Sequence, residues 1–147
     1  MTVQELKATT GRVMGVDFGE ARTGIAVSDR SRLLASGLGN VPGGGLEKTA
    51  ARILEVAAEQ GVVAIVLGLP VNMNGTEGPR AARIRELAAL LEEKLPVYLM
   101  DERMTTMAAA RFLNETNTRG KKRKGVIDTL SAEIILQNTL DRLKMMN

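Results

Sequence analysis

Residues 11–28 read GRVMGVDFGEARTGIAVS and contain the pattern that decides the fold. Two apolar runs flank a connection of turn character at 19–24, which predicts two consecutive strands. A third strand is predicted over 33–40, and Pro42 together with the glycines of 43–45 breaks the chain after it. Consecutive strands with short links favour an antiparallel meander.

The period of the pattern changes after the third strand. Apolar residues recur at helical spacing over 46–57 and 81–94, which predicts two amphipathic helices. Continuous apolar runs at 62–67 and 97–100 predict two further strands, the first buried on both faces. Because strands that alternate with helices form right-handed parallel crossovers, we predict an α/β fold in a single domain, 1–147. Its five-stranded mixed sheet has three antiparallel strands and then two parallel ones, flanked by helices.

Two more helices are predicted in the last third of the chain. Thr105 or Thr106 can cap a helix that runs to Glu115. The segment 117–125 is polar, basic and without periodicity, which predicts a loop. A final amphipathic helix covers 126–144.

The composition excludes several kinds of chemistry. The 147 residues include no Cys, His or Trp, which removes a Cys nucleophile, a His general base and a Cys/His zinc site. Catalysis would have to use carboxylates, hydroxyls, Lys, Arg or a metal held by oxygen. With one Tyr and two Phe, aromatic stacking cannot be the main mode of binding a nucleic acid.

Asp17 lies near the end of the first predicted strand. A side-chain period of two places it on one face with Val13 and Gly15. Because Gly15 and Gly19 flank it, a bulky or phosphorylated ligand could approach the backbone there. The alternative is that Asp17 bonds its own backbone in an Asx turn.

Asp101 and Glu102 follow the fifth predicted strand, beyond whose carboxyl end ligands of open α/β sheets bind. Successive residues point in opposite directions, so we expect only one of the two acids to face the site, and the sequence leaves open which. The alternative is that either acid stabilises a helix N-terminus or pairs with Arg103.

Asp128 lies in the first turns of the last predicted helix. Ser131 and Ala132 on the next turn are small, so that face can pack closely on the sheet and aim the carboxylate inward. The alternative is an acid favourably placed at a helix N-terminus. Carboxylates on two strand ends and one helix suit an oxygen-liganded Mg²⁺ or Mn²⁺. The predicted catalytic residues are Asp17, Asp101, Glu102 and Asp128, and the predicted metal ligands are Asp17, Glu102 and Asp128.

The loop at 68–79 follows the central predicted strand and precedes a helix. Its glycines and the helix N-terminus could bind a phosphate through backbone N–H groups. Asn74-Gly75 is equally a simple tight-turn signal. The predicted phosphate-binding residues are Gly68, Asn72, Asn74 and Gly75.

Five cations and no acid occur within 119–124. Since the whole chain has a net charge of +3, the rest of it carries −2, so the basic character is local. A charge run is usually a solvated face, but beside carboxylates it predicts contacts with the phosphates of a nucleic acid. The predicted nucleic-acid contacts are Arg22, Arg103, Arg119, Lys121, Lys122, Arg123 and Lys124.

Four motifs carry a resemblance to a known family: GVDFGEARTGIAVSD at 15–29, GLPVNMNGTEGPR at 68–80, DERMTT at 101–106 and KKRKGVID at 121–128. In this order they closely resemble the YqgF family, also called RuvX, whose members are described as Holliday junction resolvases or pre-ribosomal RNA nucleases. The resemblance implies a ribonuclease-H-like fold, divalent-metal dependence and a cytoplasmic bacterial protein that matures the 5′ end of small-subunit ribosomal RNA. By resemblance, Asp17 is the first-strand acid, Asp101 and Glu102 are the post-strand acids, and Asp128 is the last-helix acid.

The leading hypothesis is a metal-dependent endonuclease that processes the 5′ end of pre-16S rRNA. The alternatives are a Holliday junction resolvase in DNA recombination and repair, or a non-catalytic ribosome-assembly factor that binds RNA. An ATPase of the actin and sugar-kinase type is a further alternative. It would need two such domains around a cleft, and the 147 residues supply one. We expect a cytoplasmic monomer or homodimer without a membrane partner.

Overall fold

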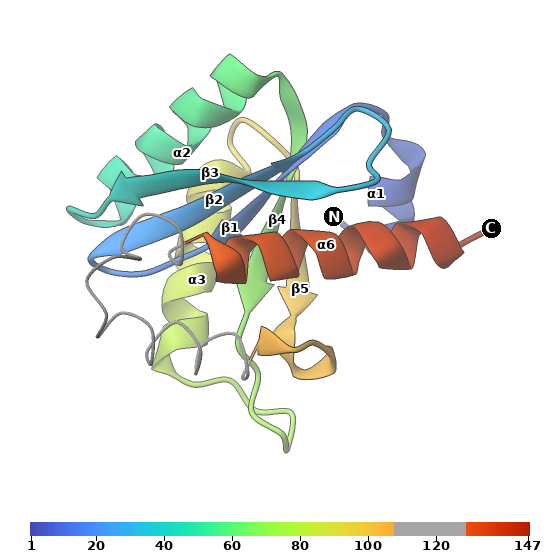
Figure 1. The fold of residues 1–147 in the computed structure, drawn as a ribbon. Coiled ribbons are helices and arrows are strands. Elements are labelled where there is room, and N and C mark those ends of the chain that lie inside the picture. The colour runs from blue at the N-terminus through green and yellow to red at the C-terminus, as the bar shows by residue number, and fades with distance from the viewer. Residues whose placement is uncertain (108–128) are drawn as a thin grey trace, which may run out of the picture.

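The computed structural model describes residues 1–107 and 129–147. They form a five-stranded sheet with helices on both faces (Figure 1). The strands are β1 (Arg12–Asp17), β2 (Arg22–Ser28), β3 (Ala35–Pro42), β4 (Val62–Leu69) and β5 (Val97–Asp101). The helices are α1 (Val3–Ala8), α2 (Leu46–Gln60), α3 (Pro79–Leu91) and α6 (Leu130–Met145), and a 3₁₀ turn, η1 (Glu102–Met104), follows β5.

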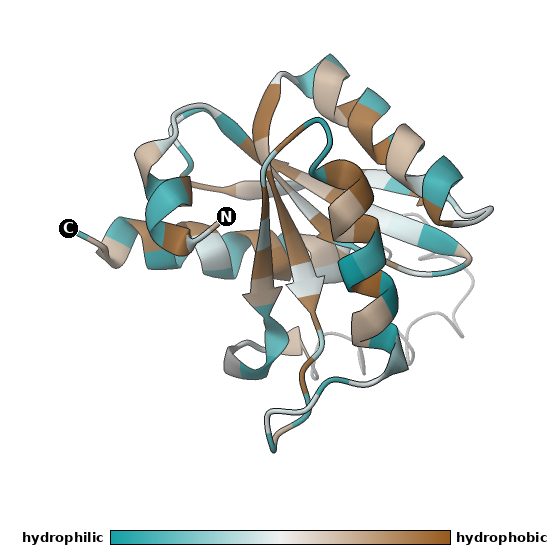
Figure 2. Ribbon diagram, turned by 180° about the vertical axis from the view of Figure 1, so that it is seen from behind, coloured by the Kyte–Doolittle hydropathy of each residue, from teal (hydrophilic) through white to brown (hydrophobic). Residues whose placement is uncertain are grey.

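The order of the strands confirms the predicted mixed sheet. They lie in the order β3-β2-β1-β4-β5. β1 and β2 are antiparallel, as are β2 and β3, whereas β4 is parallel to both β1 and β5. Because parallel neighbours need a crossover connection, α2 and α3 both return over one face of the sheet (Figure 2). The strand β1 is central, and its carboxyl end lies between the carboxyl end of β4 and the amino end of β2.

The two faces of β1 belong to two separate cores. Met14 and Val16 pack with α2 and α3, whereas Val13 packs under α6, which lies across the opposite face (Figure 1). This alternation confirms the predicted period of two. It places Gly15 and the last residue of the strand, Asp17, on the face that α6 covers.

Gly15 allows α6 to approach the sheet closely. A Cβ atom added to Gly15 would lie 2.6 Å from Cβ of Leu136 and 2.8 Å from the carbonyl oxygen of Ala132. Ser131 and Ala132 are both buried. The close packing predicted for this side of the last helix is therefore confirmed.

The bounds of β3 differ from the predicted 33–40. The strand begins and ends two residues later and includes Pro42. Among residues 1–107 and 129–147 it pairs only with β2, and an edge strand tolerates a proline because no neighbour needs the missing N–H. The β2–β3 ladder is irregular between Ile25 and Ala26, and Gly39 has a φ of +138°.

The helix α1 has no counterpart among the predicted elements. Thr2 and Glu5 form a capping box, in which each side chain accepts a hydrogen bond from the backbone N–H of the other. Lys7 Nζ donates to the carbonyl oxygen of Leu143, 2.9 Å away, which fastens α1 to the last turn of α6. The Thr-x-x-Glu spacing at 2–5 was the sequence signal for this helix.

Most of the predicted helix up to Glu115, the loop at 117–125 and the first residues of the final helix lie outside the described residues. Within 1–107 and 129–147, no helix is long and apolar enough to cross a membrane.

Candidate active site

Asp17 ends the central strand beside a cation. Its side chain is 17% exposed, and Nη2 of Arg80 lies 3.8 Å from its Oδ1. The same nitrogen donates a hydrogen bond to the carbonyl oxygen of Phe18 at 2.7 Å. Since Arg80 is bound to the backbone next to Asp17, its guanidinium is held close to the carboxylate.

Gly68 lies beside Asp17 in the sheet. Val16 pairs with Leu67 in the parallel ladder of β1 and β4, so the next residues of the two strands, Asp17 and Gly68, are neighbours. A Cβ atom on Gly68 would lie only 2.6 Å from Oε2 of Glu102. The carboxylate of Glu102 therefore lies in the space that the missing side chain leaves.

Glu102 and Asp101 point to opposite sides of the sheet. Met100 packs in the core under α6, so the alternation along β5 turns Asp101 to the other face. Glu102, the first residue of η1, is 9% exposed and lies against Gly68 and the side chain of Ile135 from α6. Of the two acids, Glu102 is thus the one on the side of Asp17.

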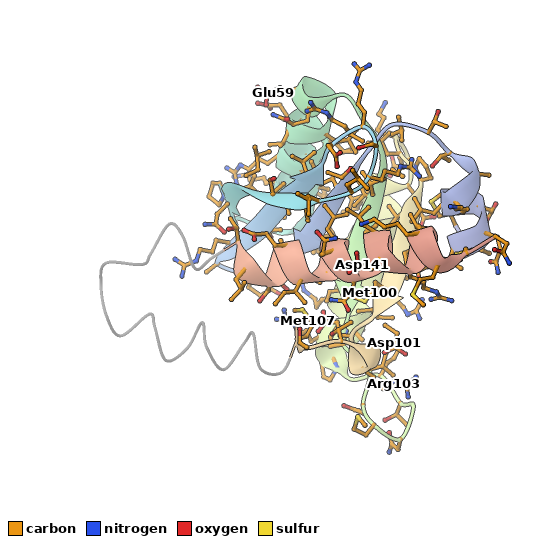
Figure 3. The ribbon with its side chains drawn as sticks, turned by 45° about the vertical axis from the view of Figure 1, so that its right-hand side comes forward. Glu59, Met100, Asp101, Arg103, Met107 and Asp141 are labelled. Carbon is orange, nitrogen blue, oxygen red and sulfur yellow. The ribbon has the colours of Figure 1, made fainter. Side chains whose placement is uncertain are left out.

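Asp101 forms an ion pair with Arg103 instead. Nε and Nη2 of Arg103 donate to its carboxylate at 3.0 and 2.7 Å, and the backbone N–H of Arg103 donates to Oδ1 at 2.9 Å. These bonds lower the pKa of Asp101 below its usual value, the side-chain bond having the largest effect. Figure 3 shows the two labelled residues side by side below the end of β5.

The third predicted ligand, Asp128, lies outside the described residues, as do Arg119, Lys121, Lys122, Arg123 and Lys124. Within 1–107 and 129–147, no group of three His, Cys, Asp or Glu side chains could hold a metal ion. Thr129 is buried and begins α6 close to Gly37 of β3. The chain therefore enters α6 on the face of the sheet where Asp17 and Glu102 lie.

The residues predicted to bind phosphate shape the loop between β4 and α3. Gly68 belongs to β4 rather than to the loop, which is a correction. The backbone N–H groups of Asn72 and Gly75 donate to the carbonyl oxygens of Thr76 and Asn72, both at 2.8 Å. Oδ1 of Asn74 accepts from the N–H of Thr76 at 3.1 Å. A phosphate would have to displace these bonds to use the two amides, and phosphate binding by the loop stays a prediction.

The two predicted basic contacts in the described residues occupy different places. Arg22 is exposed at the start of β2, opposite Pro42 at the sheet edge. Arg103 lies next to the candidate site, but its guanidinium is bound to Asp101. Arg80 was absent from the predicted site residues, although its position two residues after Gly78 puts it in the first turn of α3, the helix that follows the loop after β4.

The described acids suit a hard divalent cation. Asp17 at the end of β1 and Glu102 just after β5 offer carboxylate oxygens on either side of Gly68 in β4, on one face of the sheet. Such oxygens are the donors that Mg²⁺ and Mn²⁺ prefer. The absent side chain of Gly68 leaves the room in which Glu102 reaches this position. The two residues therefore fit such an ion.

A family model described as "RuvX: Holliday junction resolvase" matches residues 11–142, which include the sheet and nearly all of α6. The chain belongs to the RuvX family. The resemblance found in the sequence motifs is thereby confirmed.

Two relatives share the name "Putative pre-16S rRNA nuclease". One, from Ruminiclostridium cellulolyticum, is 40% identical over 90% of this chain and 95% of its own. The other, from a Bradyrhizobium species, is 46% identical over 90% of this chain and 84% of its own.

The fold of this RuvX family member is ribonuclease-H-like, as predicted. Thermus thermophilus RuvC, solved in complex with a Holliday junction substrate, superposes with a TM-score of 0.56. The match covers 93% of this chain and 98% of that one at 18% identity. At this identity the likeness concerns the fold.

Proposed function

We propose that this RuvX-family protein is a divalent-metal-dependent endonuclease that processes the 5′ end of pre-16S rRNA in the bacterial cytoplasm. The observation that carries the proposal is the carboxylate of Glu102 set against Gly68, beside Asp17 on the neighbouring strand. The names of the relatives from Ruminiclostridium and Bradyrhizobium support the substrate.

The carboxylates and Arg80 would have different tasks in this mechanism. Asp17 and Glu102, together with Asp128, would hold Mg²⁺ or Mn²⁺ through carboxylate oxygens. Such ions activate water and stabilise the charge that develops on a phosphate during hydrolysis. Arg80 keeps the carboxylate of Asp17 in place.

Cations outside the metal site have complementary tasks. Arg103 binds Asp101 away from the site, and Glu102 is the acid of the pair that would hold the metal. The cations of 119–124 would hold the nucleic-acid backbone, because Lys and Arg neutralise phosphates with release of counterions.

A four-way DNA junction is the second candidate substrate. The description of the matching family model, "Holliday junction resolvase", favours it. A symmetric junction presents two equivalent strands, which a homodimer would suit, whereas trimming an RNA precursor requires only a monomer.

A cleavage assay on both substrates tests the proposal. The purified chain is given an RNA precursor with a 5′ extension or a four-way DNA junction, with Mg²⁺ or Mn²⁺. Asp17→Asn and Glu102→Gln should each abolish metal-dependent cleavage but retain substrate binding. Glu59→Gln is the matched control, because Glu59 is an exposed carboxylate on α2, far from the site (Figure 3), and its activity should equal that of the parent.

The outcomes separate the candidate functions. Activity of Asp17→Asn equal to that of the parent would contradict the mechanism. Cleavage of the junction alone would assign the DNA substrate instead. Binding of RNA without cleavage, and without Mn²⁺ binding in calorimetry, would identify a non-catalytic assembly factor.

A further inference from the structure

The loop between β4 and α3 presents an apolar side chain beside the candidate site. Met73 is 86% exposed at the loop. Figure 3 shows this loop extending beyond Asp101 and Arg103, past the end of the sheet. Among the described residues, the other exposed large hydrophobic side chains lie elsewhere: Leu33 and Leu34 before β3, Leu38 in β3, and Met145 at the end of α6.

Hydrogen bonds within the loop hold Met73 outward. The bond from Gly75 N–H to the carbonyl oxygen of Asn72 closes a four-residue turn, in which Met73 is the second residue. Gly75 has a φ of +88°, which favours glycine at that place. Thr76 ties the two ends together, since its hydroxyl accepts from Nδ2 of Asn72 and donates to Oδ1 of Asn74. The polar side chains of the loop thus form hydrogen bonds with one another, and the thioether of Met73 is exposed to solvent.

The loop is also fastened to the residues around Glu102. Nη1 of Arg103 lies 3.5 Å from the carbonyl oxygen of Asn72, and the same guanidinium is bound to Asp101. On the other side, Nε and Nη2 of Arg85 donate to the carboxylate of Glu77 at 2.7 and 2.8 Å, which holds the loop to α3. Met73 is therefore kept at a fixed place relative to the carboxylate that follows β5.

An apolar side chain on a polar, braced loop suits insertion between bases. Proteins that distort nucleic acids insert Phe, Leu, Ile, Met or Pro between base steps and partly unstack them. The aromatic residues of the described chain are not available for this, because Phe18 is buried and Tyr98 packs under α6. The thioether of Met is polarisable and makes favourable contacts with aromatic rings.

We propose that Met73 is a wedge that enters a base step where stacking is already interrupted, at a branch point or at the boundary between single and double strand. Unstacking costs less at such a step than within a regular duplex, so the wedge would select structured substrates. The proposal rests on the proposed function, since it names the feature of the nucleic acid that the same site recognises. Met73 is a positioning residue here, because it places the strand and takes no part in hydrolysis.

Fluorescence of 2-aminopurine tests the wedge directly. The base analogue, which brightens when it unstacks, is placed at the centre of a four-way DNA junction and, separately, at the single-to-double-strand boundary of an RNA with a 5′ extension. The full chain carries Asp17→Asn throughout, so that no substrate is cleaved. Binding of this protein should raise the fluorescence of at least one of the two probes, and the probe that responds identifies the substrate class.

Three further substitutions in that background make the result specific. Met73→Ala should remove the rise and weaken binding about tenfold, which equals ~1.4 kcal/mol. Met73→Leu should keep both, because an apolar wedge of similar size remains. Met145→Ala is the matched control, with the same 86% exposure at the far end of α6, and should change neither signal. All variants should unfold at the same temperature, since both side chains are exposed.

The failures of the two proposals are distinguishable. A rise that persists in Met73→Ala, or that Met73→Leu loses equally, would overturn the wedge and leave the nuclease proposal intact. Affinity for both nucleic acids that is unchanged by Met73→Ala would also overturn it and would point to a protein contact for this side chain. A parent that binds neither nucleic acid would overturn both proposals.

Discussion

Glu102 reaches its position because residue 68 has no side chain. Its carboxylate Oε2 and Cδ1 of Ile135 both lie within 2.6 Å of the point where a Cβ would be. Gly68 has an ordinary backbone conformation, so the requirement for glycine here is one of space and not of φ. The glycine thus leaves room for the carboxylate that follows the neighbouring strand β5, and it is not required for a turn.

Gly68→Ala should displace Glu102. The added methyl group has to push aside the carboxylate or Ile135, which should lower the free energy of unfolding by about 1–3 kcal/mol. It should also weaken Mn²⁺ binding, measured by titration calorimetry. Gly78→Ala is the control, because a Cβ there meets nothing within 4 Å and φ is −97°. Mn²⁺ binding that is equal in the two variants would contradict the displacement of a metal-binding Glu102.

For single residues, the sequence predicted the face of a strand on which a side chain lies better than which acid at a strand end points to the site. The period of two placed Asp17 on one face with Val13 and Gly15, and the structure confirms it. Glu102 was among the predicted metal ligands, but the pattern left open whether it or Asp101 faces the site, since that depends on β5 ending at Asp101 and turning at once into η1. Arg80 was missed because its bond to the carbonyl oxygen of Phe18 joins residues 62 positions apart.

At the scale of elements, Asp29 organises the connection between β2 and β3. Its carboxylate accepts hydrogen bonds from the hydroxyl of Ser31 and from the N–H groups of Leu33 and Leu34. These bonds, that of Ser31 first, lower the pKa of Asp29 from 3.8 to about 2. Because the folded-state pKa is depressed, the stabilisation is present above pH 3.8 and is lost as the pH falls to about 2.

Asp29→Asn should therefore lower the free energy of unfolding at neutral pH. Its difference from the parent should shrink as the pH falls from about 4 to about 2, measured by urea denaturation across that range. Ser31→Ala removes the first of the three bonds. It should narrow the pH range over which the stabilisation by ionised Asp29 is lost. A difference from the parent that stays constant down to pH 2 would contradict the assignment.

The long, periodic elements were predictable, and the short one was not. The sheet and α2 follow from apolar patterns that extend over many residues. By contrast, α1 has six residues and only two buried side chains, Val3 and Leu6, so no period is visible in it. Its stability comes from the capping box at Thr2 and from the contact of Lys7 with α6, which is a tertiary interaction.

At the scale of the whole molecule, charge is unevenly distributed along the chain. The segment 119–124 carries five of the 20 Lys and Arg residues, and the remainder of the chain is net negative. A nucleic acid would therefore be attracted to one segment and not to the surface in general. Association should depend strongly on salt, since each neutralised phosphate releases counterions.

Replacing the five cations of 119–124 by Gln should flatten this salt dependence. The slope of log K against log[salt], measured by fluorescence anisotropy at several salt concentrations, should become less steep. The change should correspond to the loss of at most about five phosphate contacts. Lys48→Gln with Lys94→Gln is the control for net charge, because both side chains are exposed on or just after the helices that cover the face opposite α6. An unchanged slope in the fivefold variant would place the segment outside the interface.

The irregular edge of the sheet has a consequence for the protein in concentrated solution. A regular, unpaired edge strand offers N–H and C=O groups to which another molecule can add a strand, and this is a route to aggregation. Three features of β3 interrupt that row of groups. They are the irregular pairing with β2, the positive φ of Gly39 and the missing N–H of Pro42. The exposed leucines of this region therefore lie on an edge whose backbone opposes growth of the sheet from one molecule to the next.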